Sequence, residues 1–224
     1  VRAQLAAAEA GGKLYLVGGT YAAQWFAAAL TENEEYDPDS NTWSVRAPIP
    51  TARRIAGAGS LNGRVYVVGG AQADLVYTLD QNEAFDPVTN TWSALAVMPT
   101  SRRPKVAVAG GKLYALGGYT NAAYTTADKN EEYDPATNVW TSKPPVPSVR
   151  GEFGAAAYGS KLYAIGSSPG PANANEAFDP GAGSVFTGLA PNAPYSFKAK
   201  ARDFFGVETA ESVEVSTYTL AIVG

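Results

Sequence analysis

The chain has 224 residues, 46% of them hydrophobic, and its 17 basic and 21 acidic side chains give a net charge of −4. It contains no histidine and no cysteine, which excludes disulfides, imidazole or thiolate metal sites, Ser-His-Asp relays and cysteine nucleophiles. The acidic balance argues against a nucleic-acid partner, because binding to phosphates requires an excess of Lys and Arg. No apolar run reaches the ~20 residues that cross a bilayer, so we expect no membrane insertion.

One glycine-bounded segment recurs four times along the chain. The sequence Gly-Gly-Lys-Leu-Tyr-Leu-Val-Gly-Gly at 11–19 returns at 62–70, at 110–118 and, in a weaker copy that ends in Gly-Ser, at 159–167. Each copy predicts a short strand, because paired glycines permit the positive φ of a turn at its end. Together with the 23 Gly and 15 Pro of the chain, this recurrence predicts an all-β protein.

A second segment, Asn-Glu-x-aromatic-Asp-Pro, follows each of these strands. Its copies lie at 33–38, 82–87, 130–135 and 175–180. Asp-Pro predicts a turn into a further strand, which carries Trp43, Trp92 or Trp140 in the first three copies and Val185 in the fourth. An arginine precedes each glycine-bounded segment, at Arg2, Arg53, Arg102 and Arg150. Each copy therefore predicts four short strands.

These residues together resemble the kelch repeat, whose period is about 50 residues. The resemblance implies that each copy forms a four-stranded blade of a β-propeller. The four expected blades span about 1–46, 47–95, 96–143 and 144–186. Four blades are at the lower limit for a closed propeller, which leaves three alternatives: a closed ring, a piece of a longer chain, or completion by a neighbouring chain.

The pattern changes in residues 187–224. Leu189, Pro191 and Tyr195 precede an alternating run, which is similar to the tyrosine corner of fibronectin type III domains. The segment corresponds to only part of such a β-sandwich. A partial sandwich has an apolar face that needs another surface.

A residue present in every copy is expected to serve the blade, whereas a reactive site would occur once. The residues assigned to the structural repeat are Tyr15, Tyr66, Tyr114, Tyr163, Trp43, Trp92, Trp140, Glu34, Glu83, Glu131 and Glu176. The four repeated arginines have two interpretations: charge pairs across blades, or a ring of guanidinium groups that binds an acidic ligand. Arg54 and Arg103, which extend two of these positions, are expected to be solvated.

Non-repeated aromatic residues follow the glycine-bounded strands, where the copies differ. These candidate ligand-binding residues are Tyr21, Trp25, Phe26, Tyr77, Tyr119 and Tyr124. Aromatic side chains on the loops of a rigid scaffold favour contact with a protein or with sugar rings, although several could instead pack inward. No spacing of acidic residues supports a metal site, and we expect no catalytic residue and no cofactor.

The favoured function is a non-enzymatic, extracellular or cell-surface binding or structural module of bacterial type. Its partners would be other copies of the chain or another protein, through self-assembly or protein–protein contacts. This location rests on the association of kelch blades with a fibronectin type III-like segment. The alternative is a carbohydrate-binding or carbohydrate-active propeller that recognises acidic sugars, with a polysaccharide as partner; galactose oxidase chemistry is excluded because it needs His ligands and a Tyr-Cys cofactor.

Overall fold

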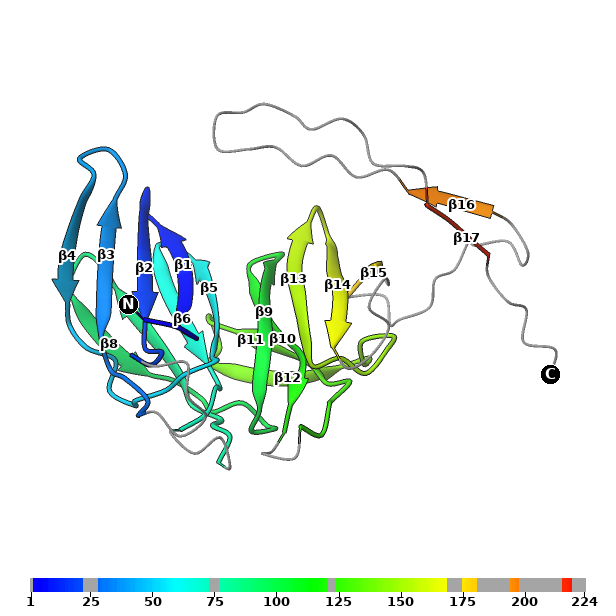
Figure 1. The fold of residues 1–224 in the computed structure, drawn as a ribbon, viewed down its shortest axis with the longest axis horizontal. Coiled ribbons are helices and arrows are strands. Elements are labelled where there is room, and N and C mark those ends of the chain that lie inside the picture. Colours follow the sequence, from blue (N-terminus) through cyan, green and yellow to red (C-terminus); the bar gives the residue numbers. More distant parts are fainter. Residues whose placement is uncertain are drawn as a thin grey trace. The chain divides into compact units, whose positions relative to one another are not determined.

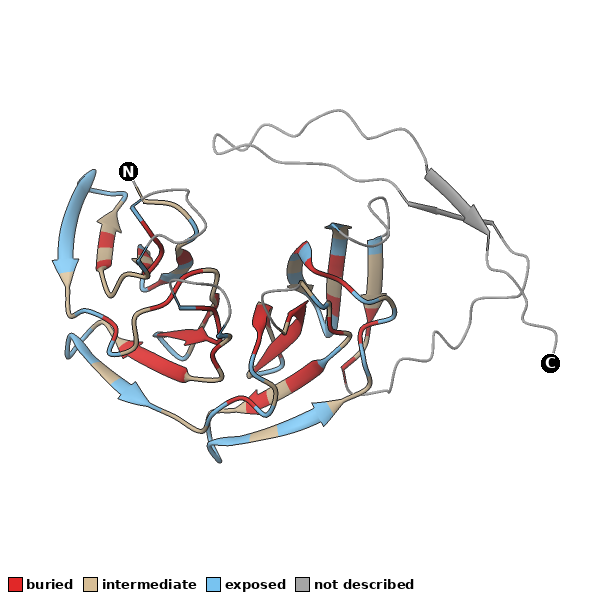
Figure 2. Cartoon of the chain, turned by 60° about the horizontal axis from the view of Figure 1, so that its bottom comes forward, coloured by how far each residue is buried: buried red, intermediate tan, exposed pale blue. Residues whose placement is uncertain are grey.

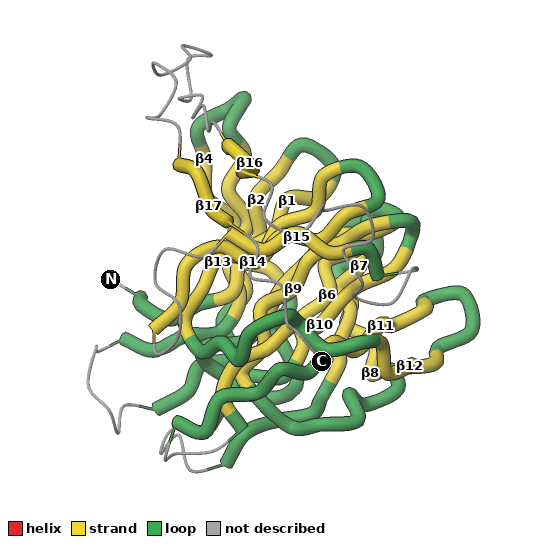
Figure 3. Tube along the Cα trace, turned by 90° about the vertical axis from the view of Figure 1, so that its right-hand side faces the viewer, coloured by secondary structure: helices red, strands yellow, loops and turns green. Residues whose placement is uncertain are grey.

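The computed structural model describes residues 2–21, 28–72, 77–120, 124–168 and 175–180, and two further strands, Pro194–Phe197 and Val215–Tyr218. The regular elements of these residues are strands, as the sequence predicts (Figure 3). In the same part of the chain, no helix has the length and apolar character to cross a membrane. Contacts divide the chain into two compact units, Val1–Ser184 and Val185–Gly224.

The first unit contains four antiparallel sheets, one for each sequence repeat (Figure 1). Blade 1 contains β1 (Ala6–Ala10), β2 (Lys13–Val17), β3 (Asn33–Asp37) and β4 (Thr42–Arg46); blade 2 contains β5 (Gly57–Leu61), β6 (Arg64–Val68), β7 (Asn82–Asp86) and β8 (Thr91–Ala94). Blade 3 contains β9 (Arg103–Ala109), β10 (Lys112–Tyr119), β11 (Asn130–Asp134) and β12 (Val139–Lys143); blade 4 contains β13 (Glu152–Tyr158), β14 (Lys161–Ser168) and β15 (Asn175–Phe178). The prediction of an all-β, four-bladed propeller is confirmed. The place of a fourth strand in blade 4 lies outside the described residues.

Each sheet has two faces, because successive side chains of a strand point in opposite directions. We call the face that blades 2 to 4 turn toward the preceding blade the leading face, and the opposite one the trailing face. In blade 1, Leu14 pairs with Tyr36 and Tyr36 with Trp43, which places all three on the leading face. Tyr15 pairs with Glu35 on the trailing face.

The apolar core lies between successive blades. Tyr15 and Val17 on the trailing face of blade 1 pack against Val65, Val67 and Phe85 on the leading face of blade 2. The same arrangement recurs between blades 2 and 3 and between blades 3 and 4. Figure 2 shows the buried residues gathered on the inner strands, while exposed residues dominate the outer strands of the blades.

The first strand of each blade lies innermost, so that β1 contacts β5, β5 contacts β9, and β9 contacts β13 (Figure 1). Among the described residues, no comparable contact joins β13 back to β1. The described residues of blades 1 to 4 therefore form a row of blades that does not close on itself.

Paired glycines connect each blade to the next. The Gly19 N–H donates to the Arg53 carbonyl at 2.9 Å, and Gly70 and Gly118 donate in the same way to Arg102 and Arg150 at 3.0 and 2.8 Å. The backbones can approach this closely because the first glycine of a pair carries no side chain: Gly18 and Gly69 have φ values of 65° and 62°, and an added Cβ would overlap the carbonyls of Arg53 and Arg102. The repeated Gly-Gly thus ends a strand and also links two blades.

In the second unit, β16 (Pro194–Phe197) and β17 (Val215–Tyr218) form an antiparallel pair. The rest of residues 187–224 lies outside the described residues. The resemblance of this segment to a fibronectin type III domain therefore stays a prediction.

Candidate binding surfaces

The repeated arginines are buried inside the blades. Arg102 donates from Nε to the Gly117 carbonyl at 2.9 Å and from Nη2 to the Ala115 carbonyl at 2.7 Å, and its Nη1 pairs with Glu131. Its side chain is 0% exposed and that of Glu131 is 2% exposed. Because burial disfavours the charged form, the pKa of Arg102 is lowered even beside this carboxylate.

The other three arginines occupy the same position. Arg53 pairs with Glu83, Arg2 with Glu34 at 2.6 Å, and Arg150 with Glu176 at 2.8 Å. Each pair lies within one blade and not across two blades. The four guanidinium side chains are 0–7% exposed, so an acidic ligand would have to displace the internal glutamates to reach them.

The second arginines, Arg54 and Arg103, are also buried, at 1% and 2% exposure, so the expectation that they are solvated is wrong. The Arg103 guanidinium lies 4.8 Å from the ring centres of both Tyr119 and Tyr124, a cation–π arrangement. The Tyr119 hydroxyl donates to the Ser168 carbonyl of blade 4 at 2.5 Å. The Arg103 cluster therefore joins blade 3 to blade 4, which no local sequence pattern indicated.

The non-repeated aromatic residues divide into two groups. Tyr119 is 4% exposed and Tyr124 is half-buried, so both pack inward. Tyr21 and Tyr77 are 63% and 65% exposed. The Tyr21 hydroxyl donates to Glu32 at 2.8 Å, and this bond raises the pKa of Tyr21. Trp25 and Phe26, the remaining candidates, lie outside the described residues.

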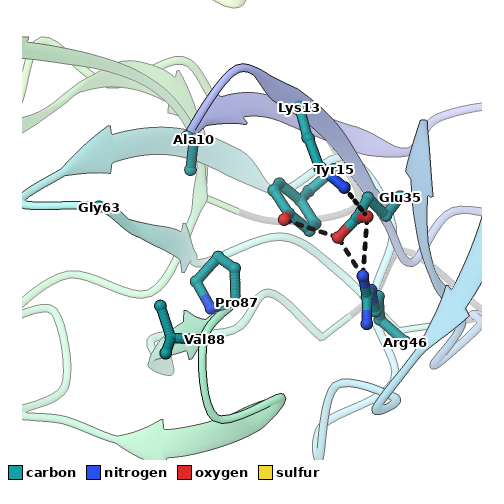
Figure 4. A pocket seen from close by; sticks show the side chains of 9 residues that line it. Ala10, Lys13, Tyr15, Glu35, Arg46, Gly63, Pro87 and Val88 are labelled. Atoms are coloured by element: carbon teal, nitrogen blue, oxygen red, sulfur yellow. Dashed lines mark hydrogen bonds and ion pairs between the residues drawn. The ribbon is translucent and has the colours of Figure 1, made fainter. Parts of the chain in front are cut away.

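A hollow of about 310 Å³ opens between blades 1 and 2, beside a polar cluster that sequence reasoning did not single out (Figure 4). Glu35 accepts hydrogen bonds from Arg46 at 2.8 Å, from the Tyr15 hydroxyl at 2.7 Å and from Lys13 at 3.1 Å. Pro87 and Val88 of blade 2 line the opposite side. These hydrogen bonds lower the pKa of Glu35 to about 2, with the largest contribution from Arg46 and smaller ones from Tyr15 and Lys13, although burial alone would raise it. The cluster is internally paired and holds the edge of the blade.

The Glu35 cluster recurs in alternate blades. In blade 3 the Tyr114 hydroxyl donates to Glu132 at 2.6 Å, and Lys143 lies 3.2 Å from the same carboxylate. Blade 2 has Ala84 and Leu95 at the positions of Glu35 and Arg46. Blades 1 and 3 therefore have a polar outer edge on the trailing face, whereas blade 2 has an apolar one.

We expect the Glu35 cluster to make the free energy of unfolding depend on pH under acidic conditions. The folded-state pKa of about 2 lies below the ordinary value of 4.5, so the stabilisation is complete above pH 4.5 and is lost as pH falls toward 2. Because the hollow is open to solvent, we expect an effect of about 2 kcal/mol. The double variant Glu35→Ala/Arg46→Leu, which carries the residues of blade 2, should lose less stability than wild type between pH 5 and pH 2. Urea unfolding over this range measures it, and parallel pH profiles of the two proteins would contradict the assignment.

A pair of hydrogen bonds fastens the outer strands of blades 2 and 3 to a residue just after the outer strand of the preceding blade. The Trp92 indole N–H donates to the Ala47 carbonyl at 2.8 Å, and the Ala47 N–H donates to Asn90 at 2.9 Å. Trp140 and Asn138 bond Ala96 in the same way, at 2.7 and 2.9 Å. We call this arrangement the Asn–Trp latch. It explains why the Asn-x-Trp motif repeats.

The described residues contain no group of three or more acidic side chains placed to hold a metal ion. The second hollow, of about 340 Å³, is lined by Gln4, Ile55, Lys105 and Glu152 from the innermost segments of all four blades. Lys105 and Glu152 form an ion pair at 3.2 Å across it.

Comparison with known families identifies the repeat. The Kelch motif matches this chain three times, over residues 2–50, 52–99 and 101–147. The chain belongs to the Kelch-motif family. These three matches correspond to blades 1 to 3, and blade 4 repeats the same fold in a more divergent sequence.

Curated Kelch proteins resemble this chain over short stretches. Kelch-like protein 35 from Mus musculus is 42% identical over 67 residues, which are 30% of this chain and 11% of that protein. Kelch-like protein 24 from Rattus norvegicus is 51% identical over 37 residues, which are 16% of this chain and 6% of that protein. The matched stretches thus span only a small part of these Kelch relatives.

The Kelch fold also matches a solved structure described as "Structure of YjhT". The TM-score is 0.65 at 20% sequence identity, with 74% of this chain and 59% of the other chain covered. A likeness at this level of identity concerns the fold alone.

Proposed function

We propose that this Kelch chain is a non-enzymatic scaffold for protein–protein contacts. The supporting observation is that the repeated ionisable groups are used inside the blades, while Tyr21 and Tyr77 are exposed. Both tyrosines lie on connections between the second and third strands of consecutive blades. Exposed tyrosines on a rigid scaffold provide large contact area at a small entropic cost, as in other protein interfaces.

The proposal includes self-assembly and a location outside the cell or at its surface. Self-assembly is supported by the exposed apolar side chains on blades 1 and 4, among them Leu14, Trp43 and Ile165. The location rests on the resemblance of residues 187–224 to a fibronectin type III segment. The acidic-sugar alternative has less support, because the four arginines that suggested it are 0–7% exposed.

The protein-binding role predicts a loss of partner capture when both exposed tyrosines are removed. We expect Tyr21→Ser/Tyr77→Ser to retain a specific partner at least about tenfold less than wild type, since hot-spot aromatics carry much of the binding energy. The measurement is affinity capture from extracts and medium of the source cells, quantified by mass spectrometry. Val88→Ser is the matched control, because Val88 is 95% exposed in the turn between β7 and β8, at the other end of the blade.

Equal capture by wild type and the double variant would contradict the role of these tyrosines. Retention of a polyuronic acid in place of a protein would favour the acidic-sugar alternative. Cell fractionation with an antibody against the chain tests the location, and recovery inside the cell would contradict it.

A further inference from the structure

The interface between successive blades follows one pattern. The leading faces of blades 2 and 3 present an aliphatic residue on the second strand, an aromatic residue on the third and a Trp on the fourth; blade 4 keeps the first two. The second- and third-strand residues are Val65 and Phe85, Leu113 and Tyr133, and Leu162 and Phe178. They are 0–4% exposed in all three blades, because the preceding blade covers them.

Blade 1 has the same residue types at the same positions, but within the described part of the chain no blade covers them. Leu14 is 43% exposed and Trp43 is 57% exposed, whereas Val65 in the position of Leu14 is 0% exposed. Glu34, also on this face, is 42% exposed, against 5% for Glu83 in blade 2. The leading face of blade 1 is thus half of an interface that the chain completes three times elsewhere.

The Asn–Trp latch shows what this face is built to hold. Asn41 and Trp43 occupy the positions of Asn90 and Trp92, which bond the backbone of the preceding blade. Asn41 accepts a hydrogen bond from Tyr36 at 2.9 Å, just as Asn138 accepts one from Tyr133 at 2.7 Å. Asn41 is therefore already oriented like Asn138 in blade 3. The Asn138 side chain also accepts a hydrogen bond from the Ala96 N–H.

The complementary half is exposed on blade 4. Ile165 on its trailing face is 50% exposed, whereas Val17, Val68 and Leu116 at the same position are 0–2% exposed. Asn175 is exposed, although its counterparts in blades 1 to 3 are 1–2% exposed. Tyr158, on the same face, is 82% exposed. In blades 1 to 3 the following blade covers these positions, and in blade 4 no described residue takes its place.

We propose that the leading face of blade 1 binds the trailing face of blade 4 of a second copy of this chain. This inference rests on the self-assembly part of the proposed function and assigns the surfaces that carry it. A second copy is the occupant because this chain itself carries both halves of the repeated interface. The contact joins two different patches, so it is head-to-tail. Two copies that close on one another would contain eight blades, within the range of known propellers.

The experiment measures the mass of the chain against its concentration by sedimentation velocity, for wild type and two variants. Leu14→Glu blocks the leading face of blade 1, and Ile165→Glu blocks the trailing face of blade 4; both side chains are partly exposed, so the fold should persist. Circular dichroism checks this. Val88→Glu adds the same charge in the exposed turn between β7 and β8 and should associate like wild type.

The expected result is that wild type associates beyond its 23.3 kDa mass and that each blocked variant alone associates at least about tenfold more weakly. A mixture of the two blocked variants should regain association, because one intact leading face then meets one intact trailing face. This recovery is specific to a head-to-tail contact.

A wild-type chain that stays monomeric up to about 200 μM, a concentration at which weak complexes form, would overturn the inference. Association that survives both variants, or a mixture that does not recover, would also overturn it, since another surface or a symmetric contact would then be responsible. Neither result bears on partner capture through Tyr21 and Tyr77, which Leu14→Glu should leave unchanged. The two proposals can therefore fail separately.

Discussion

Replacing Arg102 with alanine is expected to lower the free energy of unfolding by about 3–5 kcal/mol, the usual cost of breaking a buried ion pair from one side. The Glu131 carboxylate, which is 2% exposed, would lose its cationic partner. The carbonyl oxygens of Gly117 and Ala115 would lose the hydrogen bonds that Arg102 donates to them. Urea unfolding followed by tryptophan fluorescence measures the loss.

Arg2→Ala is the matched control for Arg102→Ala. Arg2 makes the same pair in blade 1, but Glu34 is 42% exposed and water can solvate it after the substitution. We expect the loss to be about 1 kcal/mol, as for other partly exposed ion pairs. Equal losses for the two variants would show that burial of the glutamate does not decide the cost.

A double variant separates the lost pair from the stranded charge. Arg102→Met/Glu131→Met removes both charges while keeping most of the volume, so it should be more stable than Arg102→Ala. If the double variant were the less stable of the two, the stranded carboxylate could not be the cause of the loss.

Gly118→Ala is the second substitution with a large expected effect, a loss of more than about 3 kcal/mol. Gly118 has a φ of 92°, and an added Cβ would overlap the Arg103 carbonyl and lie 3.0 Å from the Cα of Pro104. The neighbouring atoms are backbone of the adjacent strand β9, so they cannot move aside without disturbing the sheet. Thermal unfolding by calorimetry measures the loss.

Gly111→Ala isolates the steric part of this effect. Gly111 lies in the turn directly before the same strand, β10, with a φ of 74°, but no atom lies within 4 Å of the position of its added Cβ. Only the strain of a left-handed residue applies, so we expect a loss of about 1–2 kcal/mol. A loss at Gly111 as large as the one at Gly118 would contradict the role of close backbone approach.

Local signals in the sequence predicted most of the fold. Glycine pairs, the Asp-Pro turns and the tryptophans identify the ends and register of β2, β3 and β4 and of their counterparts, because these signals act over a few residues. The pairing of Arg53 with Glu83 could not be read in the same way. Arg53 precedes β5 whereas Glu83 lies in β7, and only the folded blade shows that they meet.

The uncovered faces could not be predicted from residue type. Trp43 and Trp92 stand in nearly the same sequence, Asn-Thr-Trp-Ser, yet only Trp43 is exposed. The difference depends on whether a blade lies in front, which is a property of the arrangement. The Arg103 cluster was missed for a related reason: Tyr119 stands where the other repeats have Thr20, Ala71 and Ser168, and the contact of Tyr119 and Tyr124 with Arg103 is formed by the tertiary structure.

The links between paired glycines and the following arginine carbonyls also bear on how the chain folds. Among the described residues, each blade is bonded and packed to its neighbours in sequence, so its stability is approximately the sum of its own sheet and its interfaces with those neighbours. Blades 2 and 3 share two interfaces each, whereas the terminal blades have one within the chain. We therefore expect unfolding to spread from blade to blade and to begin at blades 1 and 4, which have fewer interfaces among the described residues. A partner that covers those blades would slow the first step of unfolding for the whole row.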